Sequence, residues 1–274
     1  MSLTFHLTFP LDCENLSRLL PLLSKDPCVS NQQIAEVTGI GIGKDRSKGK
    51  VQPTIDYAIY SGLVTPQVEN GIRKLEITET GRVLMERDLW LKKPASLWVL
   101  HFFLSREGSE AEAWAFFIQE FLPRYGEFGR STLETELQQR FGGRATVKSI
   151  NPGVLLNSYL NGNALERIRI IRSKSKSVFL RTNPYIPNAF TVAYILAEIW
   201  ETKHPERLMV NPIVLSEPGH LARTMGLDEL QLQSWLDTLS ALGIIGQMKE
   251  APPYQVRRQW DNRLDLLRRS YDEV

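Results

Sequence analysis

The sequence predicts a mainly α-helical protein with small β-hairpins, built as tandem winged helix-turn-helix units around a helical middle section. Residues 30–80 carry the pattern of two helices, a hairpin and a return helix. Residues 218–256 repeat much of this pattern, and residues 167–181 alternate basic and apolar side chains as a hairpin does. The expected units are residues 1–92, 93–183 and 184–274, of which the middle one is a possible degenerate winged helix.

The composition favours a globular protein with an ample core. Of the 274 residues, 42% are apolar and 23% are charged, which gives no bias towards disorder. The formal net charge is only +2, so an argument for nucleic-acid binding must rest on where the charges lie. Two cysteines, and no apolar run near the about 20 residues that cross a bilayer, predict a reduced cytoplasmic protein that does not enter a membrane.

The first unit begins with a helix over residues 31–38. Ser30 is placed to cap this helix, Gln33 to complete a capping box, and Gly39 to end it. A second helix over residues 52–60 has a proline in its first turn and apolar residues at helical spacing. We interpret this second helix as the recognition helix of a helix-turn-helix.

The first unit continues into a hairpin, because residues 71–78 alternate loosely and precede a helix near Gly81. It differs from the C-terminal copy by six extra residues between its helices, within a loop over residues 41–50. Residues 44–50 carry four basic residues against one acid. A basic loop that leads into a helix N-terminus can place cations and backbone N–H groups against phosphates.

We therefore predict that the first unit binds duplex DNA. The residues expected to bind phosphates are Lys44, Arg46, Lys48 and Lys50. Gln52 and Thr54 are expected to reach base edges, and Arg73 or Lys74 to touch the DNA backbone from the hairpin. The alternative for residues 44–50 is a solvated surface turn.

The middle section is expected to contain helices around residues 97–104, 111–122, 132–141 and 152–160. It closes with a hairpin whose arms are residues 167–172 and 177–181, a stretch with six basic residues and no acid. A basic outer face could contact a minor groove or a phosphate backbone through Arg167, Arg169, Arg172, Lys174 and Lys176. The alternative is that these cations only discourage edge-to-edge aggregation.

The C-terminal unit is expected to serve a different purpose. A helix over residues 190–201 precedes it, and Asp228 with Gln231 forms a capping box for a helix that runs to Leu242. Acids at the start of that helix, Asp228 and Glu229, would repel a phosphate backbone. We therefore assign this copy to protein contacts or to core architecture.

No motif for catalysis, a cofactor or a metal ion emerges from the sequence. Residues 38–45 do not match a phosphate-binding loop, because Thr38 stands in place of its first glycine and Asp45 in place of its final hydroxyl residue. His101 lies in an apolar helix and is expected to be a hydrogen-bonded core histidine. We find no Ser-His-Asp, metal-ligand or paired-carboxylate pattern and predict no enzyme activity, no cofactor and no metal.

Several short runs carry a resemblance to a known family. They are residues 94–104 (PASLWVLHFFL), 41–44, 57–63, the aromatic cluster at 114–117, and Ser158 with Tyr159. Together they resemble the bacterial domain family of unknown function numbered 4007. The resemblance implies an accessory role around DNA in modification and phage-defence gene clusters, which include phosphorothioation systems. The chain departs from the family pattern at residues 45–50, where a compact turn would be expected.

The favoured function is that of a non-enzymatic, duplex DNA-binding accessory protein in a bacterial DNA modification or phage-defence system. The main alternative is a protein-interaction adaptor whose winged helices assemble modification or nuclease subunits, because this fold serves both uses. A third possibility is a transcriptional regulator of a neighbouring operon. The expected partners are accordingly duplex DNA and protein subunits of such a complex.

Overall fold

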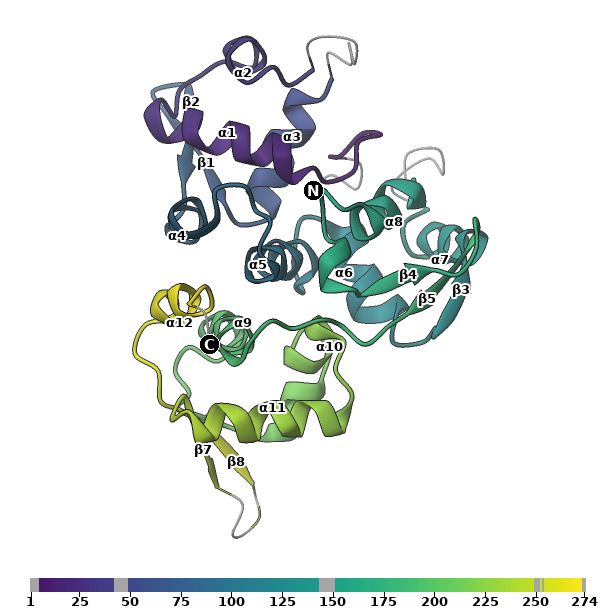
Figure 1. Cartoon of the computed structure of the whole chain (residues 1–274), viewed down its shortest axis with the longest axis vertical. Coiled ribbons are helices and arrows are strands. Elements are labelled where there is room, and N and C mark those ends of the chain that lie inside the picture. Colours follow the sequence, from purple (N-terminus) through teal and green to yellow (C-terminus); the bar gives the residue numbers. More distant parts are fainter. Residues whose placement is uncertain (1–4, 42–48, 143–150, 249–251, 253, 273–274) are drawn as a thin grey trace.

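The structure is a computed structural model that describes residues 5–41, 49–142, 151–248, 252 and 254–272. Within these residues the chain is mostly helical and carries small antiparallel sheets, which confirms the predicted fold class in its coarse form. Figure 1 shows the N-terminal segment at the top, the middle segment at the right and the C-terminal segment below, with α5 between them.

The N-terminal segment consists of helices, a hairpin and a return helix. Its elements are α1 (Cys13–Lys25), α2 (Asn31–Thr38), α3 (Val51–Tyr60), β1 (Val64–Glu69), β2 (Ile72–Ile77) and α4 (Glu79–Asp88). The predicted first helix and its capping box between Ser30 and Gln33 are confirmed as α2. β1 and β2 turn at Asn70 and Gly71, whose φ angles of 53° and 77° are those of a two-residue hairpin turn.

The middle segment runs from a buried helix to a small sheet. Its elements are α5 (Pro94–Ser105), α6 (Glu112–Phe116), the π-helical turn η1 (Phe117–Phe121), β3 (Glu127–Gly129), α7 (Arg130–Phe141), α8 (Pro152–Leu160), the 3₁₀ turn η3 (Glu166–Ile168), β4 (Ile171–Ser173) and β5 (Val178–Arg181). The predicted helix over residues 152–160 is confirmed as α8. The strands lie in the order β3-β5-β4.

The C-terminal segment repeats this plan. Its elements are α9 (Ala189–Lys203), β6 (Met209–Val210), the 3₁₀ turn η4 (Pro212–Ser216), α10 (Leu221–Met225), α11 (Glu229–Ala241), β7 (Ile245–Met248), β8 (Gln255–Arg258) and α12 (Arg263–Arg269). The predicted capping box of Asp228 and Gln231 is confirmed at the start of α11. The strand order is β6-β8-β7.

The middle and C-terminal segments thus share one order of elements: a helix, a short strand, two helices and a hairpin. In both sheets the short leading strand pairs with the second strand of the hairpin. The N-terminal segment has the helices and the hairpin, and its described sheet consists of β1 and β2 alone.

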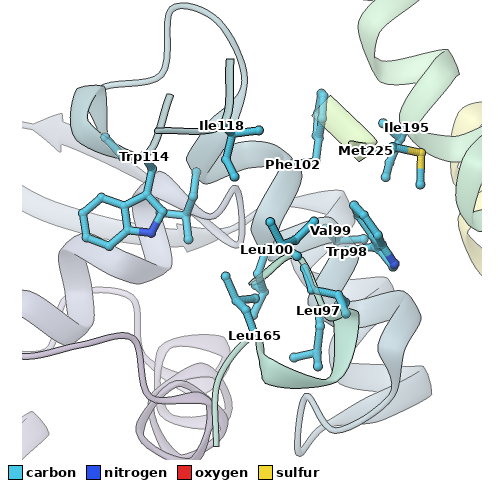
Figure 2. Packing of buried hydrophobic residues seen from close by; sticks show 14 of the residues in the cluster. Leu97, Trp98, Val99, Leu100, Phe102, Trp114, Ile118, Leu165, Ile195 and Met225 are labelled. Carbon is cyan, nitrogen blue, oxygen red and sulfur yellow. The ribbon is translucent and has the colours of Figure 1, made fainter. Parts of the chain in front are cut away.

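α5 forms the centre of the core. Ten of its twelve residues are buried, and Figure 2 shows Leu165 of the same segment beside it, together with Ile195 and Met225 of the C-terminal segment. On the N-terminal side the ring of Phe103 packs on the backbone of Gly62, where an added Cβ would lie 2.6 Å from that ring. A helix that is apolar on every side has to be covered on every side, and α5 therefore joins the three segments.

Candidate nucleic-acid interface

The predicted helix-turn-helix corner is held together by side-chain hydrogen bonds. Asn31 in α2 donates from Nδ2 to Oε1 of Gln52 at 3.2 Å, and Gln52 donates from Nε2 to Oδ1 of Asp56 at 2.7 Å. Both ends of the Gln52 amide are therefore occupied within the protein. Gln52 lies at the surface, half-buried, and has to exchange these bonds before it can contact a base.

The prediction that Thr54 reaches a base edge is wrong. Its side chain is buried, with 7% exposed, and its hydroxyl donates to the carbonyl of Lys50 at 2.8 Å. Residues 5–10 cover this side of α3, where the hydroxyl of Tyr57 donates to the carbonyl of Phe9 at 3.1 Å. A helix covered in this way presents only part of its surface to a ligand.

The predicted phosphate-binding loop is described only at its end. Lys44, Arg46 and Lys48 lie outside the described residues. Lys50 is the N-cap residue of α3, and its Nζ lies 5.7 Å from the centroid of the Phe9 ring. This contact places one cation of the loop beside the segment that covers α3.

The β1–β2 hairpin carries its two predicted site residues in different environments. Lys74 forms an ion pair with Glu69 at the surface, so a phosphate would have to displace this carboxylate. Arg73 is exposed and lies near Asp56. Burial raises the pKa of the Asp56 carboxyl, whereas the hydrogen bond from Gln52 and the charge of Arg73 lower it. An anion bound at Arg73 would have to compete with this carboxylate.

The predicted basic hairpin is shorter than expected. Its first arm starts at Ile171 and not at Arg167, because residues 166–168 form the turn η3 and Arg169 adopts a left-handed backbone with φ 54°. The placement of Arg167 and Arg169 on the outer face of a strand is therefore wrong. Arg167 donates from an Nη atom to the carbonyl of Lys92 at 2.9 Å, away from the hairpin.

The remaining three predicted cations do lie on the hairpin. Arg172, Lys174 and Lys176 are exposed, on β4 and in the turn that follows it. Lys174 is paired with Glu127 of β3 at 2.8 Å. Among the described residues, Arg172 and Lys176 have no carboxylate within ion-pair distance.

Sequence reasoning missed two features of this surface. The cover on α3 comes from residues 5–10, and its signal was the apolar run that includes Phe5 and Phe9. The dibasic pair Lys92 and Lys93, just ahead of α5, was left without a role although it lies beside Arg167. Local patterns do not show which distant segments meet.

Three of the four histidines form two hydrogen-bonded sites. The imidazole of His101 accepts at Nδ1 from the hydroxyl of Tyr159 and donates from Nε2 to the carbonyl of Thr224, both at 2.9 Å, and burial lowers its pKa to about 4. This confirms the predicted core histidine. His204 and His220 lie with their Nε2 atoms 3.2 Å apart, and burial lowers the pKa of each.

The fold resembles two crystal structures. One is SspB with a bound magnesium ion, with TM-score 0.81 and 16% identity over 98% of this chain and 87% of that chain. The other is SspB, with TM-score 0.76 and 17% identity over the same shares. At such identities the likeness concerns the fold. In the described part of this chain, no group of three or more His, Cys, Asp or Glu side chains is placed to hold a metal ion.

The other comparisons address membranes, curated proteins and families. None of the helices described has the length and apolar character needed to cross a membrane. The curated proteins include no match to the chain. The model of a family described as a protein of unknown function, DUF4007, matches residues 5–271. Because this match covers nearly the whole sequence, the chain belongs to the DUF4007 family.

Proposed function

We propose that the chain is a non-enzymatic accessory protein of a bacterial DNA modification or defence system and that it binds the backbone of duplex DNA. The genetic context is what membership of the family implies. The binding mode is supported by the order of elements and by the cations of one hairpin. This function places the protein in the cytoplasm, where the DNA is.

The three segments are proposed to be winged helix-turn-helix units. A helix, a short strand, two helices and a hairpin, with the short strand paired to the end of the hairpin, is the order of such a unit. Both complete copies have it, since β3 pairs with β5 and β6 pairs with β8. The first segment would then be a shorter version of the same unit.

The observation that carries DNA binding is the pair of exposed cations on the β4–β5 hairpin. Arg172 and Lys176 lack a carboxylate partner among the described residues, so they are available for phosphate oxygens. Seven of the nine residues of α8, the helix that precedes this hairpin, are buried, so this helix offers little surface to bases. We therefore infer contact with the DNA backbone that is independent of sequence.

Fluorescence anisotropy of a labelled random-sequence duplex over a salt series tests this function. Replacing both Arg172 and Lys176 with alanine should weaken binding and reduce the logarithmic salt slope by about 1.8, since each phosphate contact contributes about 0.9. Arg124→Ala with Arg140→Ala is the control, because these arginines are paired with Glu136 and Glu120. No binding by the wild type at low salt would refute the proposal.

The loop over residues 44–50 is proposed as a second phosphate contact. Changing Lys44, Arg46, Lys48 and Lys50 to alanine should weaken binding to every duplex sequence and flatten the salt slope further. Unchanged binding would remove this loop from the mechanism and leave the hairpin alone.

A specific observation also favours the adaptor role for the C-terminal segment. Leu230 on α11 is 83% exposed and Ile213 is 72% exposed, and both line a groove of about 920 Å³ between the middle and C-terminal segments. Exposed apolar side chains around a groove are typical of protein-binding surfaces. A protein subunit that co-purifies from the native host and is released by Leu230→Asp would support this role, which is compatible with DNA binding elsewhere.

A further inference from the structure

A row of cations and aromatic rings crosses the surface beside the start of α5. Along it lie, in order, Trp90, Lys92, Arg167, Arg169 and Tyr185. They come from three parts of the sequence that only the fold brings together. We call these five residues the α5 track.

Each step along the α5 track is fixed by a short sequence separation or a contact. Trp90 and Lys92 belong to the same loop between α4 and α5. The guanidinium of Arg167 donates to the carbonyl of Lys92 at 2.9 Å, and Arg169 follows in the same turn. The guanidinium carbon of Arg169 lies 5.6 Å from the centroid of the Tyr185 ring. The track is therefore continuous from one aromatic ring to the other.

Two more cations flank the α5 track. Lys93 places its Nζ 5.6 Å from the centroid of the Tyr271 ring, and the Arg269 guanidinium carbon lies 4.0 Å from the centroid of the Phe190 ring. Asn188 donates to the carbonyl of Ser270 at 2.9 Å, which joins these rings to the segment that carries Tyr185. These cations lie over rings, and in the part of the chain that the structure describes neither has a carboxylate within ion-pair distance.

The acids near the α5 track are turned to other partners. Asp88 accepts from the backbone N–H of Lys93 at 2.6 Å and from the hydroxyl of Ser96 at 2.7 Å. Asp272 pairs with Arg87 at 3.8 Å. The carboxylate of Glu166 lies against Gly162, where an added Cβ would be 3.2 Å from it. Among the described residues, no carboxylate lies within ion-pair distance of the track's three cations.

The backbone under the α5 track is held in an uncommon conformation at two places. Leu91, buried with 1% exposed, has φ 52°, and Arg169 has φ 54°. Left-handed backbone at residues other than glycine costs about 1–3 kcal/mol and is concentrated at functional sites. At Leu91 it buries the leucine while its neighbours Trp90 and Lys92 stay exposed.

The aromatic rings at the two ends of the α5 track are unusually exposed to solvent. Trp90 is 56% exposed and Tyr185 is 45% exposed, whereas tryptophan is mostly buried in folded proteins. Arg169 contacts the Tyr185 ring, which is the arrangement that extends a base–ring stack by a cation. Bases in a duplex are stacked on each other and are not available to such rings. Unpaired bases are available, and rings that alternate with cations are the usual means of binding a single strand.

We propose that the α5 track binds single-stranded DNA, with Lys92, Arg167 and Arg169 on phosphates and with Trp90 and Tyr185 stacked against bases. This surface is separate from the hairpin cations Arg172 and Lys176, and the inference does not depend on duplex binding. A protein with both surfaces can hold a duplex and a strand that has been separated from it.

Anisotropy of a labelled oligothymidylate of about 15 nucleotides, within the range of single-strand sites, tests the charges. Lys92→Gln with Arg167→Gln should weaken binding and reduce the logarithmic salt slope by about 1.4, since each phosphate on a single strand contributes about 0.7. Arg169→Asn tests the third position, because asparagine accepts a left-handed backbone. Arg172→Ala with Lys176→Ala is the matched control and should leave this binding unchanged.

Ring variants test stacking separately from charge. Trp90→Ala and Tyr185→Ala should each weaken oligothymidylate binding by roughly 5- to 150-fold, the effect of losing one base–ring stack. Trp90→Phe and Tyr185→Phe keep a ring and should retain most of the oligothymidylate affinity. The bond from Trp98 goes to the backbone carbonyl of Tyr185, so these changes leave that anchor in place.

The outcomes separate this inference from the proposed function. Oligothymidylate binding that falls with the track variants and not with the hairpin variant supports the inference, whatever the duplex result. No binding of oligothymidylate at low salt would overturn it, even if the duplex binds. Binding that is insensitive to Trp90→Ala and Tyr185→Ala would also overturn it. If the track variants lose duplex binding but keep oligothymidylate binding, the α5 track is a duplex-binding surface and the inference is overturned.

Discussion

α8 and α11 hold the same place in two segments of the same plan, yet one is inside the protein and the other is on its surface. Seven of the nine residues of α8 are buried, and Ser158 accepts a hydrogen bond from the backbone N–H of Leu11 at 3.1 Å. In α11 only Leu232, Leu236 and Leu239 are buried. The same order of elements therefore serves packing in one segment and leaves a surface in the other.

The difference arises from the residues on the outer face. α8 has apolar residues on every side, so it has to be covered on every side. α11 keeps one apolar stripe and carries Glu229, Ser234 and Asp237 on its exposed face. The outer face of a helix in this position thus decides whether the helix packs into the core or stays on the surface.

The largest effect is expected in α8. Tyr159 is fully buried, so Tyr159→Ala should lower the free energy of unfolding by about 3–5 kcal/mol, measured by urea denaturation. Tyr159→Phe is the matched variant: it removes only the hydroxyl that donates a hydrogen bond to Nδ1 of His101 and should cost about 1–3 kcal/mol. Equal losses in both variants would show that the hydrogen bond, and not packing, dominates at α8.

Protonation of His101 should give the next largest effect. Burial lowers its pKa from 6.5 to about 4, so below pH 6.5 the unfolded chain takes up a proton that the folded protein excludes. Stability from this group is complete above pH 6.5, falls as the pH drops towards 4, and the loss amounts to about 3 kcal/mol. Urea denaturation at several pH values measures it.

The control for this pH dependence is His101→Asn. His6, His204 and His220 also have lowered pKa values and add to the slope in both proteins. The difference between the slopes of wild type and variant isolates His101. Parallel slopes would show that His101 takes up its proton while the protein is folded.

A moderate effect is expected at the N-cap of α11. Asp228 accepts from the backbone N–H of Gln231 at 2.8 Å, and Asp228→Ala should cost about 1 kcal/mol of stability. Asp228→Asn keeps the acceptor and should cost less. Ser30→Ala at the other capping box provides the comparison in α2. No loss at either position would contradict the described caps.

The smallest effect is expected on the outer face of α11. Leu230 is 83% exposed, so Leu230→Ser should change the free energy of unfolding by less than about 0.5 kcal/mol. Thermal and urea denaturation of the isolated protein measure this change. A loss as large as that of Tyr159→Ala in α8 would mean that α11 is covered in solution, for instance by a second copy of the chain.

Local signals predicted those parts of the fold that have local causes. The caps at Ser30, Gly39 and Asp228 define helix ends through hydrogen bonds and backbone angles that involve only residues close to each other in the sequence. β3 and β6 have only three and two residues, which is too short for a periodic pattern. The three-stranded sheets were therefore not predictable from alternation.

The candidate site was harder to predict because its causes are not local. Ile168 and Ile170 are buried while Arg167 and Arg169 are exposed, so buried and exposed side chains do alternate here as the sequence indicates. This alternation comes from a 3₁₀ turn followed by a left-handed residue, and not from a strand. Residues 5–10, which cover α3, bond to Tyr57 from 48 positions away in the sequence, and no helical pattern can reveal such a contact.

α5 finally determines how the molecule should come apart. Ser96 of this helix is hydrogen-bonded to the hydroxyl of Tyr271 at 2.8 Å, and Trp98 donates a hydrogen bond to the carbonyl of Tyr185 at 2.8 Å. Phe103 packs on Gly62. Detaching any one segment would expose apolar residues of this helix to water. Heat or urea should therefore melt the three segments in a single cooperative transition, and a protease should find no stable fragment that ends between α4 and α5.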